Sequence, residues 1–140
     1  MISLQQANAI VAGAFERAED LGLKPLAVAV MDAGGHLIAY QRQDGASIGR
    51  FQIAGGKAAG ALFLGVSSRT IGEMAVERPT FIASAAAAAP AGLIPAPGGV
   101  IVADATGTVV GAVGVSGDTS DNDEICALAG IAKTGLQANA

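Results

Sequence analysis

The chain has 140 residues, of which 8 are basic and 12 acidic, giving a formal net charge of −4. Hydrophobic residues make up 51% and charged residues 14%. This balance excludes an intrinsically disordered protein, because disorder requires low hydrophobicity and high charge. The few, scattered Lys and Arg residues exclude binding of nucleic acid through a basic surface. The length fits a single domain over residues 1–140.

The longest uncharged segment, residues 79–103, does not fit a membrane span, so no membrane association is expected. Helix-breaking residues interrupt it: Pro79, Pro90, Gly92, Pro95, Pro97, Gly98 and Gly99. Cys126 is the only cysteine, which excludes a disulfide framework and a thiolate metal cluster. The first residues lack the basic segment and apolar run of a signal peptide, so we expect a cytoplasmic protein.

The low charge also bears on the surface of the protein. A domain of this size has much surface for its volume, and ordinary globular chains are about 25% charged. With 14% charged residues, much of this surface falls to small apolar side chains. We therefore expect a homo-oligomer in which the copies bury that surface.

The first predicted element is an N-terminal helix. Ser3 and Gln6 form a capping-box pattern, and Gly22 followed by Pro25 ends the helix. Apolar residues recur between them at steps of three and four: Leu4, Ala7, Val11, Ala14, Phe15, Ala18 and Leu21. The pattern predicts one buried face.

A hairpin is predicted next. The apolar run of residues 26–31 predicts a buried strand, residues 32–35 a turn, and residues 36–42 the returning strand. Because strand side chains alternate, His36 and Arg42 share one face of the returning strand, together with Ile38 and Tyr40.

Helices are predicted in the middle of the chain. Ser47 is the expected N-cap of an Ala- and Gly-rich helix over residues 47–64, whose glycines indicate close backbone approach. Ser67 begins a second helix, with Thr70 and Glu73 as a capping box.

The alanine-rich residues 83–92 fit either a helix or a packed loop. A loop, strand, turn, strand and helix then follow: residues 95–99, 100–103, 104–108, 109–116 and a helix from Ser120. Two hairpins separated by helices predict an antiparallel sheet with helices packed on it, an α+β domain.

The candidate site residues each have a functional and a structural interpretation. His36 is either a ligand or acid–base group or a turn residue, and alone it cannot build a zinc site. Arg42 and Asp44 stand where a strand meets a predicted helix start, which suits an anion, or they pair with each other. Lys57, among small residues, either extends to water or reaches into a pocket with a lowered pKa.

Two further segments are candidates. In the segment Pro97, Gly98 and Gly99, the backbone amides of the two glycines could approach a ligand closely, or the segment is an ordinary loop. Asp123 belongs to a cluster of acids whose spacing does not match an EF-hand, so helix capping is the better interpretation. We expect Arg42, Lys57 and the loop at Gly98 to converge on one anion-binding cavity.

Several ordered blocks of the sequence resemble the GlcG/HbpS family, which also forms the C-terminal domain of PduO-type corrinoid adenosyltransferases. These blocks are residues 25–37, 42–46, 57–58, 97–100, 111–117 and 123–124. The resemblance covers nearly the whole chain. It implies a five-stranded antiparallel sheet flanked by helices, with profilin-like or roadblock-like topology, and an oligomer. Family members include haem-binding proteins, proteins of glycolate and propanediol operons, and small enzymes acting on organic acids.

Three functions are compatible with these observations. The first is binding of haem or another flat anionic cofactor, with His36 as the strongest iron ligand available. The other candidate ligands are Met31, Tyr40, Met74 and Cys126.

The second function is a cofactor-independent enzyme, such as a tautomerase, hydrolase or deaminase acting on an unsaturated or hydroxy acid. Arg42 would then anchor the carboxylate of the substrate, and Asp44, Lys57 or Asp123 would move protons. The third function is that of an accessory or structural subunit.

Overall fold

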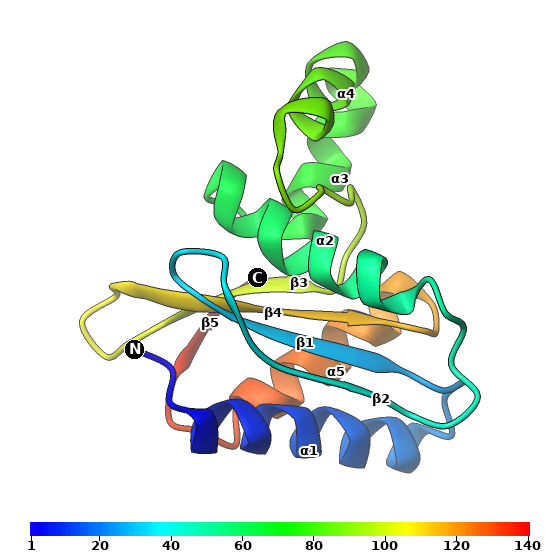
Figure 1. The fold of residues 1–140 in the computed structure, drawn as a ribbon, viewed down its shortest axis with the longest axis vertical. Helices are drawn as coiled ribbons and strands as arrows, with labels where there is room; N and C mark the ends of the chain where they lie inside the picture. The colour runs from blue at the N-terminus through cyan, green and yellow to red at the C-terminus, as the bar shows by residue number, and fades with distance from the viewer.

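A computed structural model describes all residues 1–140. It has five helices and one five-stranded antiparallel sheet (Figure 1), which confirms the predicted α+β fold class. In chain order the elements are α1 (Leu4–Leu21), β1 (Ala27–Asp32), β2 (Leu37–Arg42), α2 (Arg50–Leu64), α3 (Ser68–Glu77), α4 (Pro79–Ala88), β3 (Gly99–Ala103), β4 (Val109–Ser116), α5 (Ser120–Ile131) and β5 (Gln137–Asn139). None of the helices is both long and apolar enough to cross a membrane.

The sheet has the strand order β2-β1-β4-β3-β5, so the two predicted hairpins join through β1 and β4 at its centre. Helices α1 and α5 cover one face (Figure 1), while α2 covers the other and carries α3 and α4 outward from the sheet. Side chains on β1 alternate between these layers: Val28 and Val30 face α1, whereas Met31 packs against Ala58 and Ala59 of α2.

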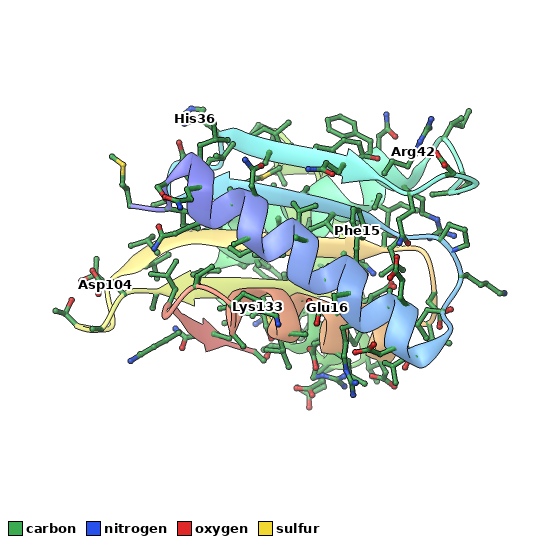
Figure 2. The ribbon with its side chains drawn as sticks, turned by 90° about the horizontal axis from the view of Figure 1, so that it is seen from below. Phe15, Glu16, His36, Arg42, Asp104 and Lys133 are labelled. Carbon is green, nitrogen blue, oxygen red and sulfur yellow. The ribbon has the colours of Figure 1, made fainter.

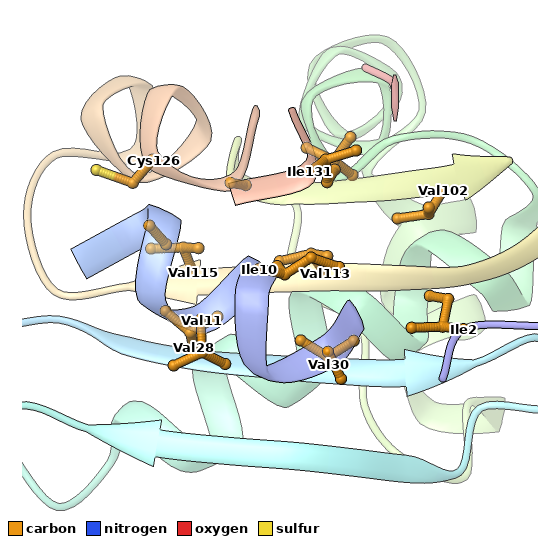
Figure 3. Close-up of a cluster of buried hydrophobic side chains, with 14 of the residues drawn as sticks. Ile2, Ile10, Val11, Val28, Val30, Val102, Val113, Val115, Cys126 and Ile131 are labelled. Carbon is orange, nitrogen blue, oxygen red and sulfur yellow. The ribbon is translucent and has the colours of Figure 1, made fainter. Parts of the chain in front are cut away.

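The main core lies between the sheet and the α1–α5 layer (Figure 3). It consists of aliphatic side chains from α1, the central strands and α5, and it includes Ile10, Val11, Val28, Val30, Val102, Val113, Val115, Cys126 and Ile131. Burial of these side chains favours folding by about 25 cal/mol per Å² of apolar surface removed from water. They hold one face of α1 against the sheet, while its opposite face remains exposed.

Helix α2 lies unusually close to the sheet, which explains its small residues. A Cβ atom on Gly114 of β4 would overlap the carbonyl of Ala54, and one on Gly60 of α2 would lie 2.9 Å from the backbone of Leu93. The close backbone approach expected from the glycines of this helix is therefore confirmed.

Helix starts were predicted with mixed success. The capping box of α1, made by Ser3 and Gln6, is confirmed. The predicted cap at Ser47 is wrong: α2 begins at Arg50, because the Ser47 hydroxyl accepts a hydrogen bond from the Arg50 side chain instead of from a backbone amide. The pairing of Thr70 with Glu73 as a cap is also wrong, since Ser67 is the N-cap and accepts from the Thr70 amide.

The ambiguous alanine-rich segment is part helix and part loop. Helix α4 ends at Ala88, and residues 89–94 run back across α2 toward the sheet. The strand β5 was not predicted from the residues, because it has three exposed residues with no apolar pattern.

Candidate functional site

Lys57 and Asp123 form a buried ion pair between α2 and the first turn of α5. The Lys57 Nζ atom lies 2.9 Å from Asp123 Oδ2 and donates a second hydrogen bond, also 2.9 Å, to the Val115 carbonyl. The other Asp123 oxygen accepts a hydrogen bond from the Asp118 amide at 3.0 Å. Lys57 is 2% exposed and Asp123 is 1% exposed.

Burial and attraction act against each other on this pair. Loss of water lowers the pKa of Lys57 and raises the pKa of Asp123, while the opposite charge of the partner works against both shifts. The nearby Arg50 guanidinium, which donates to the Ser116 hydroxyl, further lowers the pKa of Lys57. Each polar atom of the pair has a protein partner, and neither side chain lines a cavity.

The loop at Gly98 and Gly99 packs tightly against this pair. A Cβ atom on Gly98 would lie 2.9 Å from Lys57 Nζ, and one on Gly99 would overlap the Lys57 carbonyl. The Gly99 amide donates to the Ser68 hydroxyl at 2.7 Å. These glycines thus give room to the chain's own backbone and the Lys57 side chain, and the amide that we expected to face a ligand is already paired.

Arg42 and Asp44 lie elsewhere. They line an open hollow of about 480 Å³ together with Leu23, Pro25 and Gln43, and neither makes an ion pair. The expected single cavity is therefore not formed within one chain, because the cation of Lys57 is held inside by Asp123 while Arg42 faces water at the sheet edge.

His36 lies at the opposite end of β2 from Arg42, at the same end of the sheet as the turn that carries Asp104 (Figure 2). Its Nδ1 atom is 3.3 Å from Asp32 Oδ1, and its side chain is 82% exposed. Asp32 Oδ1 also accepts from the amides of Gly34 and His36, and these hydrogen bonds hold the pKa of Asp32 below its ordinary value. The imidazole lines a hollow of about 400 Å³ between the two hairpin turns.

Asp32 was missed by the sequence reasoning. The signal that could have found it is the spacing Asp-Ala-Gly-Gly-His in the first turn, which places a carboxylate four residues before the only histidine.

A groove without charged side chains runs along α2. It consists of two adjoining cavities, of about 190 and 520 Å³, between α2, the β1–β2 hairpin and residues 89–94. The α2 residues that line it fall on one helical stripe: Phe51, Gln52, Gly55, Gly56, Ala59, Leu62 and Phe63. Met31 lines the larger cavity.

The remaining candidate iron ligands lie in packed environments. Cys126 is buried in the main core, where desolvation raises the pKa of its thiol to about 11. Met74 packs against a small cluster between α3 and α4. Tyr40 makes an edge-to-face contact with Phe51, their ring centroids 4.9 Å apart. His36 and Met31 are therefore the candidates that line a cavity.

A second ion cluster, which the sequence reasoning also missed, ties α3 to α5. Arg69 pairs with Asp121 and with Glu124, whose Oε2 lies 3.1 Å from the Arg69 Nε. The helix-capping interpretation of the acid cluster therefore does not hold for Asp123, which pairs with Lys57, or for Glu124, which pairs with Arg69. The N-cap of α5 is Thr119.

Comparison with known proteins gives the family. The model of the family described as "Haem degrading protein HbpS-like" matches residues 2–132. The chain belongs to the HbpS-like family. This confirms the resemblance to the GlcG/HbpS family drawn from the sequence, and the search of curated proteins found no match.

Solved structures of other proteins share the fold. HbpS is 29% identical with a TM-score of 0.79, and the match covers 93% of this chain and 87% of HbpS. Klebsiella pneumoniae protein ORFY is 25% identical with a TM-score of 0.84, over 95% and 90% of the two chains. The PduOC–haem complex is 20% identical with a TM-score of 0.86, over 99% and 98%, and this likeness concerns the fold alone.

Proposed function

We propose that this HbpS-like protein binds haem, with the His36 imidazole as an axial ligand of the iron. The family supports a haem-related role, and the HbpS-like fold has been solved with haem in PduOC. The observation that carries the assignment to His36 is its geometry: Nδ1 faces the Asp32 carboxylate while the rest of the ring is exposed. An imidazole held in this way turns Nε2 outward, as histidines that bind metals do.

The donor set fits a single bound iron better than a structural metal ion. No group of three His, Cys, Asp or Glu side chains is placed to hold a metal ion. Haem needs only one or two protein ligands, since its porphyrin supplies the others. Bound haem would supply the redox and ligand-binding chemistry of its iron; the protein supplies the imidazole, the Asp32 carboxylate and apolar surface.

Apolar surface adjoins His36 on both sides of its turn. Val109 and Val110 line the hollow with the imidazole, and Ala33 and Gly34 of the same turn line the smaller cavity of the α2 groove. Burial of a flat porphyrin against such surface contributes about 25 cal/mol per Å². Met31, on the wall of the larger cavity, is the alternative ligand.

The geometry favours ligand binding over the enzymatic alternative. An enzyme of the expected kind needs Asp44, Lys57 or Asp123 within hydrogen-bond reach of its substrate. Lys57 and Asp123 are buried, paired with each other and absent from every cavity, which leaves Asp44, beside Arg42 in the open hollow, as the one proton-moving candidate that a substrate can reach. Arg42 remains free to attract an anion, but at a hollow that Lys57 does not reach.

Titration with haemin tests the proposal. Wild-type protein should give a saturable change of the Soret band, and His36→Ala should weaken binding at least about tenfold, because the loss of an axial ligand removes a coordinate bond. Met31→Leu is the matched control and should bind as the wild type does. Equal binding by wild type and His36→Ala, with loss in Met31→Leu, would move the ligand to Met31. No saturable change in the wild type would refute haem binding.

We further propose that the protein forms a homo-oligomer and acts in the cytoplasm. Large apolar side chains are exposed on α2, α3 and α4, among them Ile48, just before α2, with 87% and Val76 with 84% of their surface exposed. The α4 sequence carries no charge between Pro79 and Ala88. Contact between copies would remove this surface from water.

A further inference from the structure

The two hairpin turns at one end of the sheet share a common backbone design. Each begins with an aspartate, at Asp32 and Asp104, and each aspartate amide donates to the carbonyl four residues later, at 2.9 Å in both turns. In each, the aspartate Oδ1 accepts two amides, two and four residues further along. The fourth position is a glycine with positive φ in both. The hydrogen bonds that each carboxylate accepts from its own turn therefore explain why both turns begin with aspartate.

The turns differ at two positions, and both differences concern the imidazole. The final residue is His36 in the first turn and Thr108 in the second. The middle residue is Gly34 in the first and Thr106 in the second, where the Thr106 hydroxyl donates to Asp104 Oδ1 at 2.6 Å. In the first turn, which has no hydroxyl at the middle residue, the side-chain atom beside the carboxylate is His36 Nδ1, 3.3 Å from Asp32 Oδ1.

The absence of a side chain at Gly34 leaves room for the imidazole of His36. A Cβ atom on Gly34 would lie 3.0 Å from both Nδ1 and Cε1 of His36, tighter than an ordinary contact. The backbone of Gly34 does not need glycine, because its φ is not positive. The missing side chain thus serves the close approach of the ring and not the turn itself.

We infer that Asp32 is a positioning residue for His36, and that Gly34 makes room for this contact. The carboxylate favours the tautomer with the proton on Nδ1, which leaves the lone pair of Nε2 pointing outward as the donor atom. The consequence for haem affinity rests on the haem-binding function proposed above. The orientation of the ring does not, and it can be measured in haem-free protein.

The first experiment measures the tautomer of His36 by ¹⁵N NMR at about pH 9, well above the range in which imidazoles ordinarily change charge. The single histidine makes the assignment direct. We expect the Nδ1–H tautomer to predominate in the wild type and in Asp104→Asn. Asp32→Asn keeps an oxygen for the turn amides but loses the charge, and Gly34→Ala displaces the ring. Both should lose the Nδ1–H tautomer, and a wild-type spectrum in both would overturn the inference.

The second experiment follows haemin affinity in the same variants. Partners of a metal-bound histidine typically contribute 10- to 100-fold to affinity, and for this exposed pair we expect about a tenfold loss in Asp32→Asn and Gly34→Ala. Asp104→Asn weakens an equivalent turn at the wall of the same hollow but removes no partner of the imidazole, so it should lose less haemin affinity than Asp32→Asn. If Asp32→Asn binds like Asp104→Asn while His36→Ala loses binding, Asp32 does not position the ligand, and the proposed function stands.

The two failures can be told apart. Suppose that neither the wild type nor any variant binds haemin, but that Asp32→Asn alters the tautomer of His36 and Asp104→Asn does not. Haem binding is then refuted, while the orienting role of Asp32 is upheld. A thermal melt of each variant checks the turn, and similar loss of stability in Asp32→Asn and Asp104→Asn is expected because both cap a hairpin in the same way.

Discussion

Removing the charge of Lys57 should destabilise the protein more than any single surface substitution. In Lys57→Met, Asp123 Oδ2 and the Val115 carbonyl both lose their donor in the interior. Each buried group left without a partner costs about 1–3 kcal/mol, and breaking one side of a buried ion pair costs about 3–5 kcal/mol. Because small domains are stable by only about 5–15 kcal/mol, the loss is a large part of the total.

The double variant separates the pair from its surroundings. Asp123→Asn keeps an oxygen for the Asp118 amide but removes the negative charge beside Lys57. Lys57→Met combined with Asp123→Asn removes both charges, so it should cost less than the sum of the single variants, with a coupling free energy of about 2 kcal/mol. Urea unfolding followed by circular dichroism gives these values.

The pair of Lys133 and Glu16 is the matched control. Its Nζ and Oε2 atoms are 3.5 Å apart, and the side chains are 50% and 61% exposed. Solvent screens such a pair, and its coupling free energy should stay below about 1 kcal/mol. Two results would refute the reasoning: a loss below about 1 kcal/mol in Lys57→Met, or additive effects of Lys57→Met and Asp123→Asn.

Three further outcomes are expected. Sedimentation at micromolar concentration should show an oligomer, and a monomer of 13.6 kDa would contradict the proposed self-association. The carboxyl of Asp118 should titrate by NMR with a pKa of about 2, because the Asn122 side-chain amide donates a hydrogen bond to its charged form. Its contribution to the stability of the fold is therefore present above about pH 4 and is lost as the pH falls toward 2. A titration midpoint near pH 4 in the wild type would contradict this. Gly114→Ala should destabilise the fold by about 1–3 kcal/mol in urea unfolding, because its Cβ would overlap the Ala54 carbonyl, and an unchanged midpoint would show that α2 moves away freely.

Local signals predicted the elements well. The hydroxyl and amide of Ser3 and Gln6 act within four residues of chain, and so does the turn that begins at Asp32. Such contacts depend on adjacent residues alone, which is why α1 and the first hairpin were predicted with their approximate ends. Ser47 failed because its hydroxyl had a competing local partner, the Arg50 side chain.

The candidate site was predicted less well, because its contacts join residues far apart in the chain. Lys57 meets Asp123 through the packing of α2 and α5 on opposite faces of one sheet. Neither periodicity nor spacing reports such a contact. Both interpretations considered for Lys57, extension to water and reach into a pocket, assumed that its small neighbours leave space around it.

Glycine and alanine around a titratable side chain are compatible with two opposite structural arrangements, and only the contacts in the folded protein distinguish them. Small residues can leave an open pocket, or they can let two backbones come together so closely that nothing else fits. At Lys57 the second case holds, since a Cβ atom on Gly98 would lie 2.9 Å from its Nζ and one on Gly99 would overlap its carbonyl. At His36 the first case holds, because the space left by Gly34 admits the ring while 82% of the side chain stays exposed. The cation enclosed by glycines therefore stabilises the fold, whereas the imidazole beside Gly34 stays open to solvent, as the proposed haem ligand must be.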